Sequence, residues 1–314
     1  VFMGDMRYED TKLYEDGFWE KNRIAPKRAW VKHIDTGARR LDFEDGGALD
    51  YDALVVATGS RSNRFGWPGQ DLAGVHGLYG MPDIEAIGAS AARARRAVIV
   101  GGGLIGIELA EMLLARGIPV TFLVREKSFW DIVLPEEEAR LINRHILAHG
   151  DDLLLGTELA EILPDGDGRA RGVVTKSGEE IPCELVGLTV GVSPNIAVAK
   201  DSGIECDRGV LVDSRFRTSA PGVFAGGDCA QHRAPPPGRR PVEQVWYTGK
   251  IHGEHIAANL CGEDRTYEPG VWFNSAKFFD VEYQTYGTVP PRATEGTESF
   301  YWEEPSGLDR KSVV

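Results

Sequence analysis

The spacing of apolar positions changes several times along the chain, and each change predicts a different element. Residues 1–30 mix charged and aromatic side chains, which predicts helix and loop there. Between residues 31 and 59 short apolar stretches alternate with turn signals at 35–37 and 45–47, a pattern that predicts an antiparallel meander. The meander leads into the apolar run 53–57, which is typical of a buried strand.

The next part of the chain predicts a strand, a glycine-rich turn, a helix and a second strand. Strands are expected at 97–100 and 120–124, and the helix at 104–116 carries one apolar face at helical spacing. A short helix is expected before them at 83–96 and another after them at 136–149. Strands that alternate with helices favour a parallel sheet covered by helices, so the predicted fold class is α/β.

The second half of the chain predicts further strands and one long helix. Residues 153–190 read as strands with turns, and the short apolar stretch 210–212 leads to the glycine-rich segment 222–228. A helix is expected at 242–260. The last fifty or so residues alternate aromatic and polar positions, which predicts strands of a small third domain.

Composition and charge narrow the class of protein. The chain has 314 residues, enough for two or three domains, and its 42% hydrophobic and 26% charged residues are typical of a globular protein. The net charge of −13 repels phosphate backbones and anionic membranes, so nucleic acid is not expected as a partner. Because no apolar run reaches about 18 residues, no membrane-spanning helix is expected either.

Cysteine and histidine spacing gives no sign of a metal site. The four cysteines lie far apart, which excludes a CxxC redox motif and a zinc ribbon: Cys183, Cys206, Cys229 and Cys261. They are interpreted as small buried side chains in a reducing compartment, so a cytoplasmic protein is expected. His252 and His255 lie three apart on the predicted last helix. Without carboxylate partners they are interpreted as structural, and no metal is predicted.

The strongest motif is the G-x-G-x-x-G at residues 101–106, directly after the apolar strand and at the start of the helix. Gly101 permits the tight turn, Gly103 lets the backbone approach a pyrophosphate, and Gly106 lets helix and strand pack closely. The helix then offers the free amides of Leu104 and Ile105 and its positive dipole end to the phosphates. The alternative is a glycine-rich turn that binds nothing.

The residues at the end of the next strand leave the choice of nucleotide open. Arg125 would accommodate the extra phosphate of NADP, whereas Glu126 would bind the ribose hydroxyls of NAD. Either side chain could instead be a solvated surface charge. Arg125 gives a slight preference for NADPH.

Four segments together resemble the pyridine nucleotide-disulfide oxidoreductase superfamily. Residues 51–60 read YDALVVATGS, residues 191–195 read GVSPN, and residues 218–228 end in the sequence FAGGD; they flank the motif at 101–106 in the family's order. The nearest resemblance is to NADH oxidases, rubredoxin and ferredoxin reductases, and the flavoprotein portion of nitrite reductase large subunits. The resemblance implies two Rossmann-like dinucleotide-binding domains, of which the FAD domain is incomplete, and a partial α+β C-terminal domain.

The resemblance also implies where the domains lie. Residues 1–89 and 206–266 would form the FAD-binding domain, residues 90–205 the NAD(P)-binding domain, and residues 267–314 part of the C-terminal domain. The family's first G-x-G-x-x-G and its redox cysteine pair are not in this sequence. The FAD domain is therefore expected to lack its first βαβ unit, as in a chain truncated at its N-terminus.

The family pattern assigns cofactor contacts to particular residues of this chain. Asp228 would accept hydrogen bonds from the ribityl chain of FAD, although it could instead be an N-cap. Glu108 would lie near the nicotinamide, although it could be a surface charge, and Trp246 would lie near the flavin ring, although it could be core. The remaining residues implied to contact FAD or the nicotinamide nucleotide are Ala57, Thr58, Gly59, Gly191, Gly227 and Val245.

The function implied is that of a flavoprotein oxidoreductase. It would move a hydride from NAD(P)H to FAD and pass the electrons to an acceptor, which is either a small molecule or an electron-carrier protein. The cofactors carry this chemistry, so no catalytic side chain is nominated. The alternative is a truncated module that binds NAD(P) without redox activity.

Overall fold

The structure is a computed structural model that describes residues 2, 6–292, 294–303 and 310–313. Apart from the first two residues, the chain divides into two compact units. The first unit comprises residues 3–61 and 193–272, and the second unit comprises residues 62–192 and 273–314. This division rests on packing alone, so the three-domain boundaries expected from the sequence stay a prediction.

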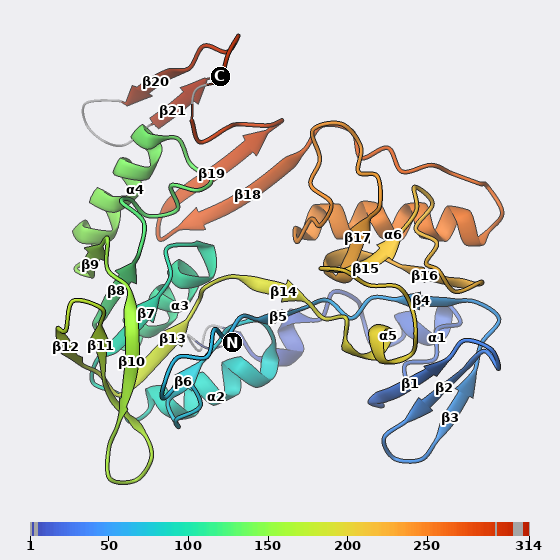
Figure 1. Ribbon diagram of the computed structural model, residues 1–314, viewed down its shortest axis with the longest axis horizontal. Coiled ribbons are helices and arrows are strands. Elements are labelled where there is room, and N and C mark those ends of the chain that lie inside the picture. Colours follow the sequence, from blue (N-terminus) through green and yellow to red (C-terminus); the bar gives the residue numbers. More distant parts are fainter. Residues whose placement is uncertain (1, 3–5, 293, 304–309, 314) are drawn as a thin grey trace. The chain divides into compact units, whose positions relative to one another are not determined.

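A five-stranded parallel sheet forms the centre of the second unit (Figure 1), and its strand order is β6-β13-β7-β8-β9. Every residue of β7 is buried, as expected for a strand covered on both faces. The predicted parallel sheet is therefore confirmed. Its strands are β6 (Val75–His76), β7 (Ala97–Val100), β8 (Val120–Val124), β9 (Asp152–Leu155) and β13 (Leu185–Leu188).

Each face of this sheet has its own covering layer. On one face the apolar sides of α2 (Met81–Ala91), α3 (Leu104–Leu114) and α4 (Glu136–Ala148) pack on Ile99 and Phe122. On the other face Val98 and Leu123 pack against a three-stranded antiparallel sheet. That sheet consists of β10 (Leu159–Pro164), β11 (Ala170–Thr175) and β12 (Glu180–Pro182). Alternate residues of β7 thus point into two separate cores.

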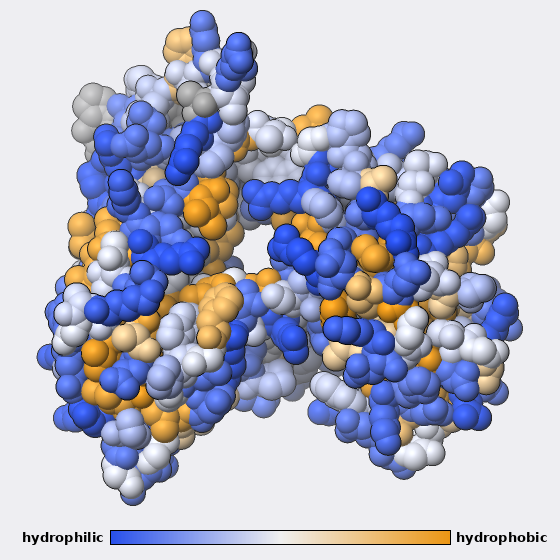
Figure 2. Space-filling view, in the orientation of Figure 1, coloured by the Kyte–Doolittle hydropathy of each residue, from blue (hydrophilic) through white to orange (hydrophobic). Residues whose placement is uncertain are grey.

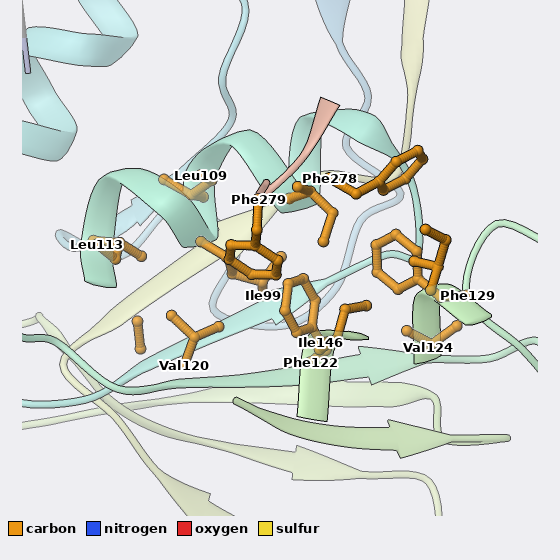
Figure 3. Close-up of a cluster of buried hydrophobic side chains, with 14 of the residues drawn as sticks. Ile99, Leu109, Leu113, Val120, Phe122, Val124, Phe129, Ile146, Phe278 and Phe279 are labelled. Atoms are coloured by element: carbon orange, nitrogen blue, oxygen red, sulfur yellow. The ribbon is translucent and has the colours of Figure 1, made fainter. Parts of the chain in front are cut away.

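The C-terminal hairpin adds aromatic side chains to the helical side of the second unit. Its strands are β18 (Phe273–Phe278) and β19 (Val281–Tyr286), joined by a turn at residues 279–280. Figure 3 shows Phe278 and Phe279 among side chains of α3, β7 and β8, and both are buried. Further on, β20 (Phe300–Glu303) pairs with β21 (Arg310–Val313). The aromatic alternation predicted strands here, and strands are present.

The first unit begins with the predicted antiparallel meander of β1 (Val31–Asp35), β2 (Arg40–Phe43) and β3 (Ala48–Asp50). Two parallel pairs follow: β4 (Leu54–Val56) with β16 (Val223–Ala225), and β15 (Val210–Val212) with β17 (Ala230–His232). The other elements of the described chain are η1 (Tyr8–Thr11), α1 (Phe18–Lys21), β5 (Ser60–Ser62), β14 (Val192–Pro194), α5 (Ala197–Asp201), η2 (Gly227–Cys229) and α6 (Trp246–Leu260).

The core of the first unit lies between its strands and α6. Val56, Val223 and Ala225 from the β4–β16 pair pack with Ile256 of α6 and with Phe216, and all five are buried. The helix predicted at 242–260 begins four residues later, at Trp246. This packing of the two strands and α6 holds in place the chain that continues from the end of β4 at Val56 and from the end of β16 at Ala225.

The surface of both units is mixed. Figure 2 shows hydrophilic residues over most of the visible face, with smaller hydrophobic areas between them. Aspartate and glutamate number 48, against 35 lysine and arginine residues. No helix in the described part of the chain is long and apolar enough to cross a membrane.

Candidate dinucleotide-binding sites

The glycine motif lies where the middle strand of the second unit's sheet meets a helix. β7 ends at Val100, and the amide of Gly101 donates to the carbonyl oxygen of Leu123 on β8 at 2.9 Å. Gly103 is the N-cap of α3 and has an extended backbone. The turn therefore carries the chain from the carboxyl end of a parallel strand into a helix, as the sequence predicts.

The three glycines of the motif have different neighbours. Gly101 has a φ of +120°, and a Cβ there would lie 2.5 Å from the carbonyl oxygen of Thr189. A Cβ on Gly106 would lie 3.1 Å from the hydroxyl of Thr189, so this glycine lets helix and strand pack closely. A Cβ on Gly103 would meet only Trp130, at an ordinary 3.8 Å. Packing within the protein thus explains Gly101 and Gly106, while Gly103 leaves room beside the backbone.

The first amides of α3 are available to a ligand. Within the described residues the amides of Leu104 and Ile105 make no hydrogen bond, and Gly103 offers no side-chain cap. The amide of Gly106 already donates to Gly103 at 3.0 Å. Unbonded amides and the positive end of the helix dipole at one place form an anion-binding position. A diphosphate fits this arrangement because its charge and oxygens match the two donors.

Arg125 and Glu126 follow β8, at the strand end where this kind of fold recognises the ribose. Arg125 Nε donates to Glu126 Oε1 at 2.6 Å. The side chain of Arg125 is 74% exposed, whereas that of Glu126 is 21% exposed. The two predicted determinants therefore lie side by side as an ion pair.

Two further predicted residues lie in or beside the second unit's sheet. Glu108 is on α3 and exposed, and partial desolvation, followed by the charge of Glu111, raises its pKa. Its exposure is also what the alternative of a surface charge requires. Gly191 comes shortly after β13, and its carbonyl accepts a hydrogen bond from the Asn63 amide at 3.0 Å.

The residues implied to contact flavin gather in the first unit. β4 and β16 run parallel with Val56 level with Ala225, so both strands end at the same edge. The predicted residues Ala57 and Thr58 follow the first strand, and Asp228 follows the second. In open α/β sheets, ligands bind outside the carboxyl ends of such strands. The structure thus brings together two segments that are about 170 residues apart in the sequence.

The segment after β4 is held by hydrogen bonds to Asn195. Thr58 Oγ1 donates to the carbonyl of Asn195 at 2.5 Å, and the amide of Asn195 donates to Gly59 at 2.8 Å. These contacts join the ATG part of residues 51–60 to the PN part of residues 191–195 within the first unit. Two motifs that the resemblance treats separately are therefore structural partners.

The start of α6 lies against the turn that contains Asp228. Val245 is the N-cap of α6, and a Cβ on Gly249 in its first turn would lie 3.7 Å from Gly227 Cα. Trp246 is 67% exposed, so the alternative that it is a core residue is wrong. Asp228 lies inside the short helix η2, whose N-cap is Gly226, so the alternative of an N-cap is wrong as well.

The buried ring of His252 positions the same turn. The amide of Gly227 donates to His252 Nδ1 at 3.1 Å, and Nε2 lies 3.2 Å from the Tyr267 hydroxyl. Burial above all, and then the charges of neighbouring histidines and Arg239, lower the pKa of His252 to about 3. The ring is therefore neutral at ordinary pH, with an unprotonated Nδ1 that accepts from Gly227.

Several residues in these sites are absent from the sequence prediction. His252 was expected to be structural, but nothing in the sequence links it to Gly227. Thr189, which packs on two glycines of the motif, follows a strand without any pattern of its own. Outside these sites, His145 and His149 are not among the predicted residues either, although their spacing of four on the predicted helix 136–149 is a readable signal.

The cysteines are free, as expected. Cys183 and Cys229 are buried, and burial raises the pKa of Cys229, whose thiol donates to the carbonyl of Val56 at 3.4 Å. The expectation that the cysteines are buried is wrong for Cys261, which is exposed at the end of α6.

Comparison with known proteins identifies the family. A family model described as pyridine nucleotide-disulphide oxidoreductase matches residues 20–249, well over half of the chain. The chain belongs to this family. The resemblance of its motifs to this superfamily is thereby confirmed.

Curated relatives of this family member are named as reductases. A nitrite reductase [NAD(P)H] of Bacillus subtilis is 29% identical over the whole chain, which spans 38% of that protein. A ferredoxin–NAD(P)(+) reductase of Sphingomonas is 30% identical over 89% of the chain and 68% of that protein. The chain thus spans less than half the length of the nitrite reductase that it matches.

Solved structures confirm the fold class. The ferredoxin reductase of a cytochrome system from Rhodopseudomonas palustris superposes with a TM-score of 0.86 at 25% identity, over 96% of this chain and 73% of that one. The α/β fold with Rossmann-like dinucleotide-binding units is therefore confirmed for this member of the family.

Proposed function

We propose that this chain works in a flavoprotein oxidoreductase that takes a hydride from NAD(P)H to FAD and passes the electrons on. The observation that carries the proposal is the start of α3, where two amides have no partner among the described residues. At the preceding residue, Gly103, a Cβ would meet only Trp130, at an ordinary distance. A diphosphate held there would place a nicotinamide nucleotide on the second unit. The family membership supports the flavin part of the proposal.

The chain's own residues bind and orient in this proposal, while the bound cofactors supply hydride transfer. Leu104 and Ile105 donate their amides to the diphosphate, and Glu108 helps to hold the nicotinamide end. Arg125 or Glu126 contacts the adenosine ribose or its phosphate. When bound, the nicotinamide nucleotide would supply a hydride, which is one proton with two electrons, and the flavin would accept it.

On the flavin side the proposal rests on the segments that meet at the ends of β4 and β16. Asp228 accepts hydrogen bonds from ribityl hydroxyls, since a short acidic side chain can accept two donors at once. Thr58 and Gly59 border the flavin dinucleotide. The exposed ring of Trp246 next to Val245 offers an apolar face near the flavin ring.

The acceptor in this proposal is an electron-carrier protein. The support is that several relatives are named as reductases of ferredoxin or rubredoxin. The acidic net charge of −13 would suit a carrier with a basic face. Four free cysteines are compatible with a reducing compartment, and we infer the cytoplasm.

Gly103→Ala tests the nucleotide part of the proposal. Its backbone is extended and its surroundings open, so alanine folds normally there. The methyl group occupies the space that a diphosphate needs, and we expect the Kd for NADH or NADPH to rise at least tenfold, or about 1.4 kcal/mol. Isothermal titration calorimetry measures the change. The control is Gly253→Ala on α6, where a Cβ meets no atom within 4 Å, and nucleotide affinity stays unchanged.

Equal affinity of Gly103→Ala and the unmutated chain would contradict the site at α3. Separate titration with FAD, followed by anaerobic addition of NADH or NADPH, tests the redox part. The proposal predicts flavin absorbance that bleaches. Nucleotide binding without FAD binding would instead support the alternative of a nucleotide-binding module.

A further inference from the structure

Three potential metal ligands converge on the helical side of the second unit. His145 lies in the last turn of α4, His149 is its C-cap, and Asp280 lies in the turn between β18 and β19. Asp280 Oδ1 is 2.5 Å from His145 Nε2 and 3.5 Å from His149 Nε2. Among the described residues, this is the only group of at least three histidine, cysteine or acidic side chains whose donor atoms lie close enough to share one ion.

The helix places the two imidazoles on one face because residues four apart lie one turn above each other. His149 Nδ1 lies 2.9 Å from the carbonyl oxygen of His145, so Nδ1 carries the proton that it donates. In the neutral ring Nε2 then has a free lone pair directed to the side of Asp280. Such a bond from the far ring nitrogen to a backbone carbonyl is the usual way in which a metal-binding histidine is oriented.

The hairpin turn fixes the third group. The ring of Phe279 stacks on the ring of His149, with centroids 4.3 Å apart and planes at 9°. Phe279 is buried and has a φ of +55°, a conformation that costs a residue with a side chain about 1–2 kcal/mol. Buried packing offsets this strain and holds Asp280, the next residue, beside the histidines.

Within the part of the chain that the structure describes, the ion-pair partners of Asp280 are His145 and His149 alone. Arg144, the residue before His145, makes a two-pronged ion pair with Glu303 at 2.7 and 2.9 Å. Asp280 is 76% exposed, so its carboxylate can move and water can reach the cluster. The three facing groups, an imidazole lone pair, a second imidazole and a carboxylate, attract a cation.

We propose that His145, His149 and Asp280 bind one divalent transition-metal ion of the zinc class. Two imidazoles and one carboxylate are ligands that Zn²⁺ accepts, at about 2.0–2.2 Å each. Tetrahedral geometry at those lengths separates the ligand atoms by about 3.3–3.6 Å. The 3.5 Å between Asp280 and His149 already fits, and the contact of Asp280 with His145 opens by about 1 Å through rotation of an exposed carboxylate.

The ion would bind the C-terminal hairpin to the end of α4. Three protein ligands leave a fourth position for water or an external ligand. None of the three residues belongs to the candidate nucleotide or flavin contacts, so the site stands independently of the proposed redox function.

Calorimetric titration of the chelator-treated full chain with ZnCl₂ tests the site. We expect one equivalent to bind, and we expect Asp280→Asn and His149→Gln each to weaken the affinity at least tenfold. Asp280 and His149 are accessible, so both variants fold. Matched controls are Asp167→Asn, an exposed carboxylate in another hairpin turn, and His33→Gln, an exposed histidine of the first unit; both bind as the unmutated chain does.

Thermal unfolding gives a second measurement. Zinc at saturating concentration should raise the midpoint for the unmutated chain and for the two controls, but not for Asp280→Asn. The proposal is overturned if the chain binds no stoichiometric zinc, or if zinc binding is the same in Asp280→Asn and His149→Gln as in the controls. In either case Asp280 makes only hydrogen bonds or ion pairs with His145 and His149, and the three residues do not bind a metal ion.

Discussion

Two glycine turns of this chain follow a parallel strand, yet they are held in different ways. In the second unit the turn before α3 is held by local backbone packing, since Gly101 lies against the carbonyl of Thr189 on the neighbouring strand's end. In the first unit the turn at Gly227 is held from outside, by the ring of His252 on α6. A short motif thus specifies the first turn, whereas a distant side chain specifies the second. The following variants test that contrast.

The largest effect is expected for Gly101→Ala. The φ of +120° is strained for alanine by about 1–2 kcal/mol, and the new methyl group would lie 2.5 Å from a backbone oxygen that cannot move away. Overpacking adds about 1–3 kcal/mol, so we expect a loss of about 2–5 kcal/mol in the free energy of unfolding. Urea unfolding followed by circular dichroism measures it. A loss below about 1 kcal/mol would mean that this turn is not held by its backbone.

A pH-dependent effect is expected for His252. In the unfolded chain this histidine takes up a proton as the pH falls through about 6.5, whereas in the folded protein its pKa is lowered to about 3. Between these values the unfolded state binds more protons, so the free energy of unfolding falls with falling pH. The slope from this group is about 1.4 kcal/mol per pH unit.

His252→Gln should remove that slope, and it should also cost about 1–3 kcal/mol at pH 7 because Gly227 and Tyr267 lose a buried partner. Unfolding curves at several pH values between 4 and 7 compare the two chains. The control is His33→Gln, whose side chain is exposed. An unchanged slope in His252→Gln would show that the ring does not hold the turn in its neutral form.

The smallest effect is expected for Gly227→Ala. The φ of +69° is strained for alanine, but a Cβ there meets no atom within 4 Å. Only the conformational cost of about 1–2 kcal/mol remains, so the loss should be clearly smaller than for Gly101→Ala. The same urea experiment measures both. If the two losses are equal, backbone packing does not hold the turn at Gly101 more tightly than the turn at Gly227.

The sequence allows much of the second unit to be predicted because its information is local. A buried strand, three glycines and an amphipathic helix lie within about 20 residues, and Gly101 and Gly106 each have a steric reason. The predicted helix at 104–116 is observed at Leu104–Leu114, and the helix at 136–149 is observed at Glu136–Ala148. The order of the strands is then restricted by the rules for parallel sheets.

Contacts between distant segments could not be predicted in this way. Nothing near Gly227 indicates that the ring of His252 accepts its amide. Nothing near Thr58 indicates that the backbone carbonyl of Asn195 accepts its hydroxyl. The aromatic alternation near the C-terminus predicts strands, but not that Phe278 is buried on α3's side of the sheet. These pairings depend on tertiary packing, for which the spacing of residues gives no signal.

The burial of Phe278 and Phe279 in the second unit has a consequence for the order in which the chain folds during synthesis. In the sequence, residues 193–272 of the first unit separate Phe278 and Phe279 from the strands of the parallel sheet that these two rings help to cover. During translation, both segments of the first unit therefore leave the ribosome before Phe278 and Phe279 of the second unit do. The second unit starts before residues 193–272 are made and is finished after them, so the two units mature in an interleaved order.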